Sequence, residues 1–432
     1  MPPGSPSGAT HRGPSTAPRR RAATTRAYDV VLYGATGFVG RQTVARFAAH
    51  APRGLRWALA GRSAERLERV RAACGPGAAR AGIVVADAGD TAALDALAAD
   101  ARVVLSTAGP FALHGDALVD ACVARRTHYV DITGETPWVR RLIDRHHARA
   151  AAEGTRIVPC CGFDSVPSDL GAWLVASAIR ARHDTPCVEV RAAFSLRGGL
   201  NGGTLASALN LMDAGEAGRL ADVFLLNPPG TAPRGGAAHG DPALPVHDPD
   251  LDAWLAPFVM APVNTRVVRR SAALLAAAGD PVYDRDFRYQ EYLRVGRGRA
   301  GAIAAGGLAL GVGAGRASMR LAAARALVRR MAPAPGEGPS EASMDGGAFR
   351  CELVGRSRDG HVLRGRIAGR GDPGNRATTV FVCEAALALA GPADALPRDA
   401  GAGGVLTPAT ALGDALARRL AAAGMTVEPM PA

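Results

Sequence analysis

The sequence predicts an α/β protein with two parts: a doubly wound parallel sheet at the N-terminal end, and a second α+β domain on a largely antiparallel sheet. The first part is predicted because short apolar runs alternate with helical patterns between residues 28 and 165. Such alternation builds a parallel sheet, since each helix carries the chain back to start the next strand in the same direction. The second part is predicted because the rhythm changes near residue 166 to strand-like stretches, the first of which alternates as a strand with one wet face does. These stretches are 188–196, 282–294, 349–357 and 361–369.

The first strand and the turn after it are typical of a pyrophosphate site. Residues 30–32 form a short apolar run, and a helical pattern begins after glycines spaced G-x-x-G-x-x-G. This order directs the free N–H groups of a helix N-terminus at an anion. We therefore expect an N-terminal Rossmann dinucleotide-binding domain; the alternative is a βα unit whose glycines only make a turn. The expected cofactor contacts here are Gly34, Thr36, Gly37, Phe38, Val39 and Gly40.

The end of the second strand indicates which dinucleotide binds. Residues 57–60 read as this strand, and Arg62 and Ser63 follow it. In NAD-binding domains an acidic residue usually stands here and accepts a hydrogen bond from the ribose 2′-hydroxyl. A guanidinium and a hydroxyl instead suit a 2′-phosphate. The sequence therefore predicts NADP(H) as the cofactor, against the alternative of an arginine on a solvated loop.

The next two strands add further cofactor contacts. The third strand, 83–86, ends at Asp87, where a contact to the adenine side is expected. The fourth strand, 103–105, opens into a loop that should lie beside the cofactor crevice, because ligands bind at the carboxyl ends of parallel strands. From this loop we expect Thr107, Gly109 and Pro110 near the nicotinamide half.

The composition excludes several classes of function. The formal net charge is +12, but the basic residues are dispersed arginines without interleaved aromatic residues, so no nucleic-acid partner is expected. The chain contains no lysine, which excludes a Walker A motif and a Schiff-base lysine. Its seven cysteines show no metal-ligand spacing, so we expect no metal site and the reduced thiols of a cytoplasmic protein.

The chain divides into four predicted segments. Residues 1–27 carry no acidic side chain and are expected to form a disordered basic arm. Residues 28–165 form the dinucleotide-binding domain, and 166–394 form the second domain, for substrate or dimerisation. Residues 395–432 contain an amphipathic helix over 412–422, with Thr407 as a candidate N-cap and Pro408 at the first helical position.

An apolar segment interrupts the second domain. Residues 300–315 carry no charge, and an arginine-bearing helix is expected at 316–330. Sixteen residues are fewer than the roughly 20 that a spanning helix needs. The two readings are a peripheral contact with anionic lipid and an ordinary interdomain helix pair.

With these motifs identified, the chain resembles the saccharopine dehydrogenase-like oxidoreductases, and among them the branch of mycobacterial trans-acting enoyl reductases and their eukaryotic relatives. The resemblance implies an NADP-binding Rossmann domain, a second α/β domain and a final helix that returns to the first domain. It implies hydride transfer to an enoyl group of a polyketide or lipid thioester, but no settled catalytic residue. The matching stretches are 34–40, 58–63, 109–111, 127–135, 161–169, 202–204, 257–260, 264–271, 371–374 and 407–408.

Enoyl reduction requires a hydride at the β-carbon, a polarised thioester carbonyl and a proton for the α-carbon. The candidate catalytic residues are Asp164, Ser165 and Tyr129, and the alternative role of Asp164 is a helix N-cap. The candidate substrate contacts are Gly202, Gly203, Thr204, Asn264 and Arg266, of which the last two could instead serve ion pairing between domains.

Two other functions stay open at this stage. One is an amino-acid dehydrogenase of the saccharopine type, although some of these enzymes use a lysine as acid and base and this chain has none. The other is a non-catalytic NADP-binding scaffold on a lipid surface. The expected partner is a small-molecule or carrier-bound lipid or polyketide substrate, and a homodimer is left open.

Overall fold

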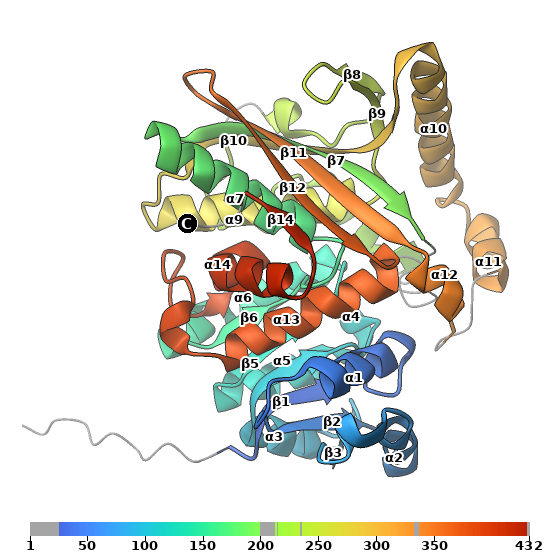
Figure 1. Cartoon of the computed structure of the whole chain (residues 1–432), viewed down its shortest axis with the longest axis vertical. Helices are drawn as coiled ribbons and strands as arrows, with labels where there is room; N and C mark the ends of the chain where they lie inside the picture. Colours follow the sequence, from blue (N-terminus) through green and yellow to red (C-terminus); the bar gives the residue numbers. More distant parts are fainter. Residues whose placement is uncertain (1–25, 199–211, 214, 234–235, 332–336, 430–432) are drawn as a thin grey trace, which may run out of the picture.

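The computed structural model describes residues 26–198, 212–213, 215–233, 236–331 and 337–429. A parallel sheet lies at one end of the molecule, a mixed sheet lies at the other, and helices lie between them (Figure 1). The predicted fold class, a doubly wound parallel sheet followed by a largely antiparallel one, is confirmed.

The parallel sheet has the strand order β13-β6-β5-β4-β1-β2-β3. Its central strands β1 and β4 pair with Leu32 opposite Leu105 and Tyr33 opposite Ser106. The strand order reverses beside β1, and ligands of doubly wound sheets bind at that point. The strands are β1 (Tyr28–Tyr33), β2 (Trp57–Gly61), β3 (Gly82–Val85), β4 (Ala101–Ser106), β5 (His128–Asp131), β6 (Arg156–Val158) and β13 (Gly404–Val405).

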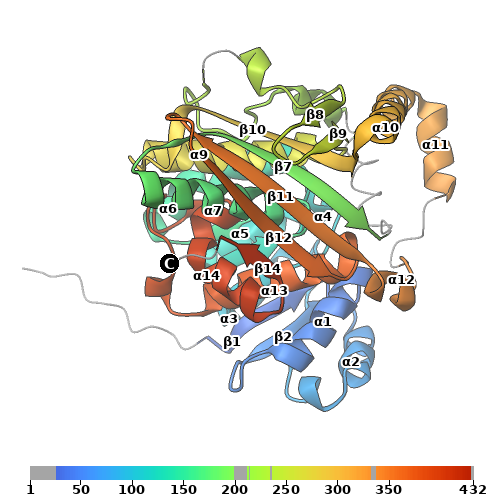
Figure 2. The same cartoon turned by 45° about the horizontal axis from the view of Figure 1, so that its top comes forward.

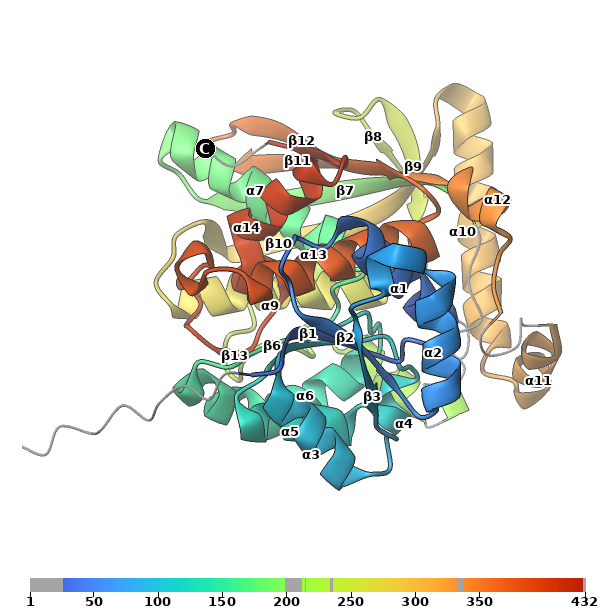
Figure 3. The same cartoon turned by 60° about the horizontal axis from the view of Figure 1, so that its bottom comes forward.

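Helices cover both faces of the parallel sheet (Figure 3). Phe47 of α1 and Leu67 of α2 belong to one hydrophobic core with Leu32 of β1. Leu94 of α3 and Leu142 of α6 belong to the core on the opposite face. The helices of this part are α1 (Phe38–His50), α2 (Ala64–Ala73), α3 (Thr91–Asp100), α4 (Phe111–His114), α5 (Asp116–Arg125) and α6 (Thr136–Glu153).

The second sheet has the order β14-β12-β11-β7-β10-β9-β8 and crosses the molecule obliquely in Figure 2. Its central strand β7 pairs antiparallel with β11 but parallel with β10, and the other pairs are antiparallel. The strands are β7 (Cys187–Arg197), β8 (Val246–Asp248), β9 (Ala253–Pro257), β10 (Tyr283–Gly296), β11 (Ala348–Ser357), β12 (Val362–Arg370) and β14 (Thr426–Glu428).

A layer of four helices joins the two sheets. Helix α7 packs on β11 and β12 of the mixed sheet, whereas α13 packs on β1, β4 and β5 of the parallel sheet. Helix α14 contacts both α7 and α13, and one hydrophobic core contains both Leu32 of the parallel sheet and Leu353 of the mixed one. The helices of this layer are α7 (Val166–His183), α9 (Ala261–Ala277), α13 (Thr378–Ala390) and α14 (Pro408–Ala422).

The C-terminal part of the chain contributes to both sheets. Helix α13 and strand β13 belong to the parallel sheet's side, and β14 is an edge strand of the mixed sheet. The division at residue 394 stays a prediction, but the packing shows that elements on each side of that residue serve the same sheet. The predicted start of the last helix is confirmed: Thr407 caps α14 in a capping box, and Pro408 is its first residue.

The apolar segment is longer than predicted. Helix α10 covers Gly298–Ser318, 21 residues, so the count of sixteen underestimated it. The arginine-bearing helix is shorter than predicted, because the helix breaks at 319–321 before α11 (Ala322–Met331). A short helix, α12 (Glu341–Asp345), then leads into β11.

Candidate active site

The phosphate turn between β1 and α1 has the geometry that its glycines predict. Gly34 has a φ of +83°, and a Cβ there would lie 2.9 Å from the backbone nitrogen of Ala108. A Cβ on Gly40 would lie 2.1 Å from the carbonyl oxygen of Gly34, so this glycine lets the helix pack against the turn. A Cβ on Gly37 would meet only the oxygen of Gly34, at 3.3 Å. Helix α1 begins at Phe38, and its N-cap residue Gly37 has no side chain to cap it, so the N–H groups of the first turn stay available to an anion.

The residues predicted for the adenosine half gather at the ends of β1, β2 and β3. Arg62 is exposed at the end of β2. Burial raises the pKa of Tyr33 to about 12, and the nearby charges of Asp87 and Arg62 act on it in opposite directions, which places both beside this ring. Ser63 caps α2 by accepting a hydrogen bond from the Arg66 backbone nitrogen at 3.3 Å, and its hydroxyl proton stays available for donation.

A continuous set of contacts leads from the phosphate turn toward the nicotinamide side. Thr107 donates backbone and side-chain hydrogen bonds to the carbonyl of Tyr33, at 2.9 and 3.3 Å. The loop then passes Gly109 and Pro110, both partly or fully exposed, into α4. The Glu135 carboxylate accepts hydrogen bonds of 2.9 Å from the backbone nitrogens of Phe111 and Ala112. The carboxyl ends of β4 and β5 are thereby tied into one wall.

Asp164 lies on this wall, at the start of the chain that leads into α7. A Cβ built on Gly134 would lie 4.0 Å from Asp164 Oδ2 and 3.8 Å from Val263 Cγ1, so the carboxyl group faces the loop after β5 and the start of α9. Asp164 stays partly exposed. Burial among protein atoms raises its pKa to about 6. Such a carboxyl group holds a proton over part of the physiological range and is able to donate it.

Ser165 and Asn264 are two predicted site residues that lie 99 positions apart in the sequence. The fold brings their side chains into contact. The Ser165 hydroxyl donates to Asn264 Oδ1 at 3.4 Å, and Asn264 Nδ2 donates to Glu291 Oε1 at 2.8 Å. Glu291 also accepts hydrogen bonds from Ser168 at 2.8 Å and from the Tyr289 hydroxyl at 3.1 Å. Burial raises the pKa of Glu291 to about 7. All of these side chains are buried, so they support the site from behind and do not face the crevice.

Tyr129 does not reach the crevice. Its ring is 0% exposed in the core between the parallel sheet and its helices. Its hydroxyl faces Asp131 and Ser106, and burial raises its pKa well above the ordinary value. Asp131 in turn accepts hydrogen bonds from the backbone nitrogens of Thr133 and Cys160, at 2.9 and 3.0 Å. In this structure the expectation of a catalytic Tyr129 is therefore corrected: its hydroxyl is enclosed by strand ends and has no path to a substrate.

Arg266 is also turned away from the crevice. It is 1% exposed, and its guanidinium pairs with Asp241 and donates to the carbonyl of Leu220. The next arginines of α9, Arg269 and Arg270, donate to backbone carbonyls of the same surrounding loops. The structure thus corrects the substrate role of Arg266. The residue pairs within the predicted second domain, since Asp241 also lies in 166–394, and not between domains as the alternative expected. Gly202, Gly203 and Thr204, together with a helix expected at 205–212, lie wholly or largely outside the described residues.

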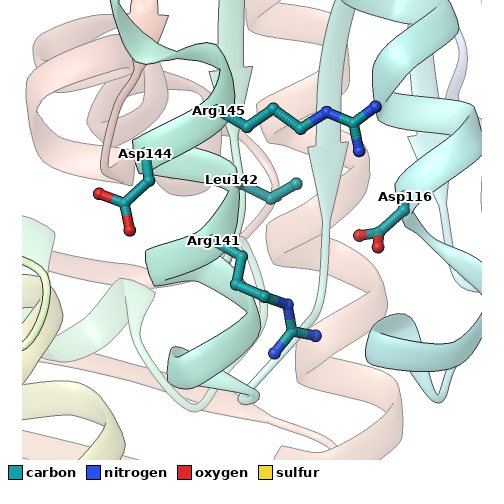
Figure 4. Close-up of a pocket in the computed structure, with 5 residues that line it drawn as sticks. All are labelled: Asp116, Arg141, Leu142, Asp144 and Arg145. Carbon is teal, nitrogen blue, oxygen red and sulfur yellow. The ribbon is translucent and has the colours of Figure 1, made fainter.

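Two hollows in the described surface lie away from the crevice. The larger, about 390 Å³, is formed by α6 and the start of α5, and its lining residues are drawn in Figure 4. The other, about 270 Å³, is formed mainly by α1, the end of β12 and the start of α13. Charged side chains dominate the larger hollow, and its ion pairs hold the helices together: Arg145 pairs with Asp120 at 2.6 Å. Neither hollow contains any of the predicted cofactor residues.

The residues of the crevice fit a bound NADP(H). The turn at Gly34, Gly37 and Gly40 provides a helix N-terminus for the pyrophosphate, and the partly exposed Thr36, Phe38 and Val39 border it. Arg62, exposed at the end of β2, is the cation that we expect to meet a 2′-phosphate. Sequence reasoning did not identify Gly134 and Val263, which face Asp164, or Glu291. Glu291 could have been found from the sequence, because it stands at an inward position of the alternating strand 282–294, where a charged side chain needs partners.

Comparisons with known proteins agree with this site. A family model for the saccharopine dehydrogenase NADP binding domain matches residues 30–158. A protein of Mycobacterium tuberculosis provisionally named trans-acting enoyl reductase is 43% identical over 94% of this chain and 98% of its own. The trans-acting enoyl reductase of Mycobacterium bovis is 40% identical over 93% of this chain and 97% of its own.

Among solved structures, the saccharopine dehydrogenase of Saccharomyces cerevisiae covers 93% of this chain and 99% of its own, with 13% identity and a TM-score of 0.49. The family match lies on the segment that forms the phosphate turn and the Arg62 loop, so the cofactor of this domain is NADP(H). From the near full-length identity, the chain belongs to the trans-acting enoyl reductase family, and it carries the saccharopine dehydrogenase-type NADP-binding domain.

Proposed function

We propose that this protein is an NADPH-dependent enoyl reductase that saturates a C=C bond of a lipid or polyketide thioester. The observation that carries the proposal is the identity of 40–43% to proteins named trans-acting enoyl reductases over 93–94% of the chain. The crevice supports it, because it combines a dinucleotide turn with a partly exposed carboxyl group of raised pKa.

The chemistry of the crevice assigns a role to Asp164. Bound NADPH supplies the hydride for the β-carbon of the enoyl thioester. The reaction then needs one proton at the α-carbon, and we assign its delivery to the carboxyl group of Asp164, which is partly exposed beside Gly134 and whose pKa burial raises to about 6. The buried hydrogen bonds from Ser165 through Asn264 to Glu291 hold the start of α7 in place and so orient the residue before it.

The amino-acid dehydrogenase alternative has less support. A zwitterionic substrate requires a cationic side chain in the crevice, and the chain has no lysine. Arg266, Arg269 and Arg270 of α9 already pair with Asp241 or donate hydrogen bonds to backbone carbonyls. A non-catalytic scaffold would not explain the raised pKa of the Asp164 carboxyl group, because perturbed pKa values cluster at functional sites.

The decisive experiment is a turnover assay with the full chain. NADPH absorbance is followed with a trans-2-enoyl N-acetylcysteamine thioester of medium chain length, and the product is identified by mass spectrometry. We expect one saturated thioester for each NADPH consumed. The matched assay contains a 2-keto acid with an amino acid in place of the thioester. NADPH consumption in that assay alone would support the amino-acid dehydrogenase, and consumption in neither would contradict the proposal.

The role of Asp164 predicts a pH profile. A general acid works in its protonated form, so kcat/KM should be level below pH 6 and fall tenfold per pH unit above the pKa of about 6. Asp164→Asn should remove this limb and lower kcat by about 10²–10⁴-fold, while NADPH affinity stays the same.

The matched control for this variant is Asp144→Asn, which alters an exposed carboxylate on α6 that pairs with Arg140. This change should leave kcat and the pH profile unaltered. If Asp164→Asn keeps the parent's kcat and its falling limb, another group supplies the proton and the assignment of Asp164 is wrong.

The cellular setting of the proposed reaction follows from its partners. The structure is compatible with a protein of the cytoplasm, where NADPH is available. We further propose that a carrier presents the thioester substrate and that two copies of the chain form a homodimer. Sedimentation equilibrium with and without NADPH tests the dimer.

A further inference from the structure

Helix α10 is apolar and yet stands at the edge of the molecule, beside the mixed sheet (Figures 1 and 2). Only 11% of the most apolar stretch of this helix is buried. The helix attaches through its first turns, where Gly301 and Ala305 pack against the end of β10 and strand β9. Ile303 and Leu310, which lie seven residues apart and so on one face, are 77% and 78% exposed.

The following helix extends this apolar surface. Twelve large hydrophobic side chains are exposed in the described part of the chain, and five of them lie between residues 303 and 327. They are Ile303, Leu308, Leu310, Leu321 and Leu327. Soluble proteins rarely gather exposed apolar residues in this way unless the surface has a partner. We call residues 298–331 the α10–α11 arm.

The charge of the α10–α11 arm has one sign. Between Glu291 and Glu337 the sequence contains eight arginines and no acidic residue. Arg325 and Arg329 pair with Asp213, which lies elsewhere in the chain. The other four arginines of the arm are exposed: Arg299, Arg316, Arg320 and Arg330. An exposed apolar face bordered by arginines complements an anionic lipid surface, because the apolar side chains enter the acyl boundary while the cations meet headgroups.

The topology excludes a membrane-spanning arrangement of the arm. Strand β10 enters the arm and β11 follows it, and both flank β7 in the same sheet. The chain must therefore leave and return on the same side of a membrane. Helix α10 is about 31 Å long and could cross the hydrocarbon core once, but among the described residues of the arm the return crossing has only α11, which is about 15 Å long. An arm of this build can enter one leaflet only.

We infer that the α10–α11 arm is a monotopic docking surface for anionic membranes, with α10 lying in one leaflet and the arginines at its headgroups. This inference does not depend on the proposed reaction, although an arm in this position would suit a lipid substrate. After the arm, the chain passes Gly338, where a Cβ would lie 2.5 Å from the Phe38 ring, and Phe38 is the first residue of α1 at the phosphate turn. The membrane-facing arm thus returns directly beside the cofactor site.

Vesicle flotation of the full chain tests the inference. We expect binding to vesicles of equal phosphatidylglycerol and phosphatidylcholine at low salt, weaker binding as salt rises, and at least tenfold weaker binding to pure phosphatidylcholine. The variant Ile303→Glu/Leu310→Glu should bind the anionic vesicles at least tenfold less, about 1.4 kcal/mol. The variant Arg316→Glu/Arg320→Glu should show a similar loss together with a reduced salt dependence.

The matched control is Leu244→Glu, which alters a side chain that is 77% exposed outside the arm and should float like the parent. Unchanged NADPH affinity in every variant shows that the fold is intact. Absence of flotation by the parent overturns the inference, as does equal flotation of the Ile303→Glu/Leu310→Glu variant. If that variant instead converts a dimer of the parent into a monomer, a second copy covers the arm and the membrane role is wrong.

Discussion

At the scale of single residues, we predict that Arg62 decides which dinucleotide the protein prefers. It is exposed beside Tyr33 at the end of β2, where an acidic residue would select NAD. We expect NADPH to bind at least tenfold more tightly than NADH, about 1.4 kcal/mol. Arg62→Asp should abolish or reverse this preference, because the carboxylate repels the 2′-phosphate. Fluorescence titration with both dinucleotides measures the effect.

The control for this change lies on the adjoining helix. Arg69→Asp alters the same charge on α2, where Arg69 pairs weakly with Glu65 at 3.7 Å and is largely exposed. This variant should keep the parent's preference. Equal affinity of the unaltered protein for NADPH and NADH would show that Arg62 lies on a solvated loop without a role in selection.

Carboxylates show how far residue patterns could be interpreted. Asp131 ends β5, and Glu135 and Asp164 follow β5 and β6. Asp131 and Glu135 are structural, since each accepts two backbone hydrogen bonds. Asp164 is distinguished from them by its partial exposure and by neighbours from distant segments.

At the scale of elements, the three glycines of the phosphate turn have separable roles. A Cβ on Gly37 meets only one backbone atom, at 3.3 Å, so Gly37→Val should keep the fold but intrude on the pyrophosphate. We expect loss of NADPH binding, with a circular dichroism spectrum and melting temperature close to those of the parent. Retained binding would mean that the turn only packs.

Gly40→Ala provides the contrast. Its Cβ would lie 2.1 Å from the Gly34 carbonyl oxygen, so α1 could not keep its place against the turn. This variant should therefore melt at a clearly lower temperature. Together the two changes separate the binding role of one glycine from the packing role of the other.

At the scale of the whole molecule, Arg156 connects the parallel sheet to the C-terminal segment. It is 4% exposed, and its guanidinium donates to the carbonyls of Ala411 and Pro397. Arg156→Met removes the donor from one buried and one partly buried carbonyl and should lower the free energy of unfolding by about 2–4 kcal/mol. Thermal unfolding followed by circular dichroism measures this loss. One cooperative transition is expected, because elements after residue 394 belong to both sheets.

Arg149→Met is the matched control, since Arg149 is 55% exposed and pairs with Glu153 on its own helix. Its effect should be within about 0.5 kcal/mol of zero. If the two variants melt at the same temperature, the contacts of Arg156 do not hold the C-terminal segment in place.

The sequence by itself determined the features that depend on neighbouring residues. The phosphate turn, the Arg62 loop, the alternation of strands and helices, and the capped start of α14 are all local patterns, and the structure contains each of them. The length of α10 was underestimated because only the uncharged run 300–315 was counted, whereas the helix continues through Arg299 and Arg316.

The tertiary structure decided the features that depend on residues far apart in the chain. The hydrogen bond from Ser165 to Asn264 spans 99 positions, and the one from the Ala409 backbone to Asp169 spans 240. The same long-range packing buried Tyr129 and turned Arg266 toward Asp241, whereas it left Asp164 partly exposed beside Gly134. Residue type alone does not tell a buried polar side chain from one that is exposed to a substrate. A polar side chain can act on a substrate only if folding leaves some of its hydrogen-bonding capacity without a partner inside the protein.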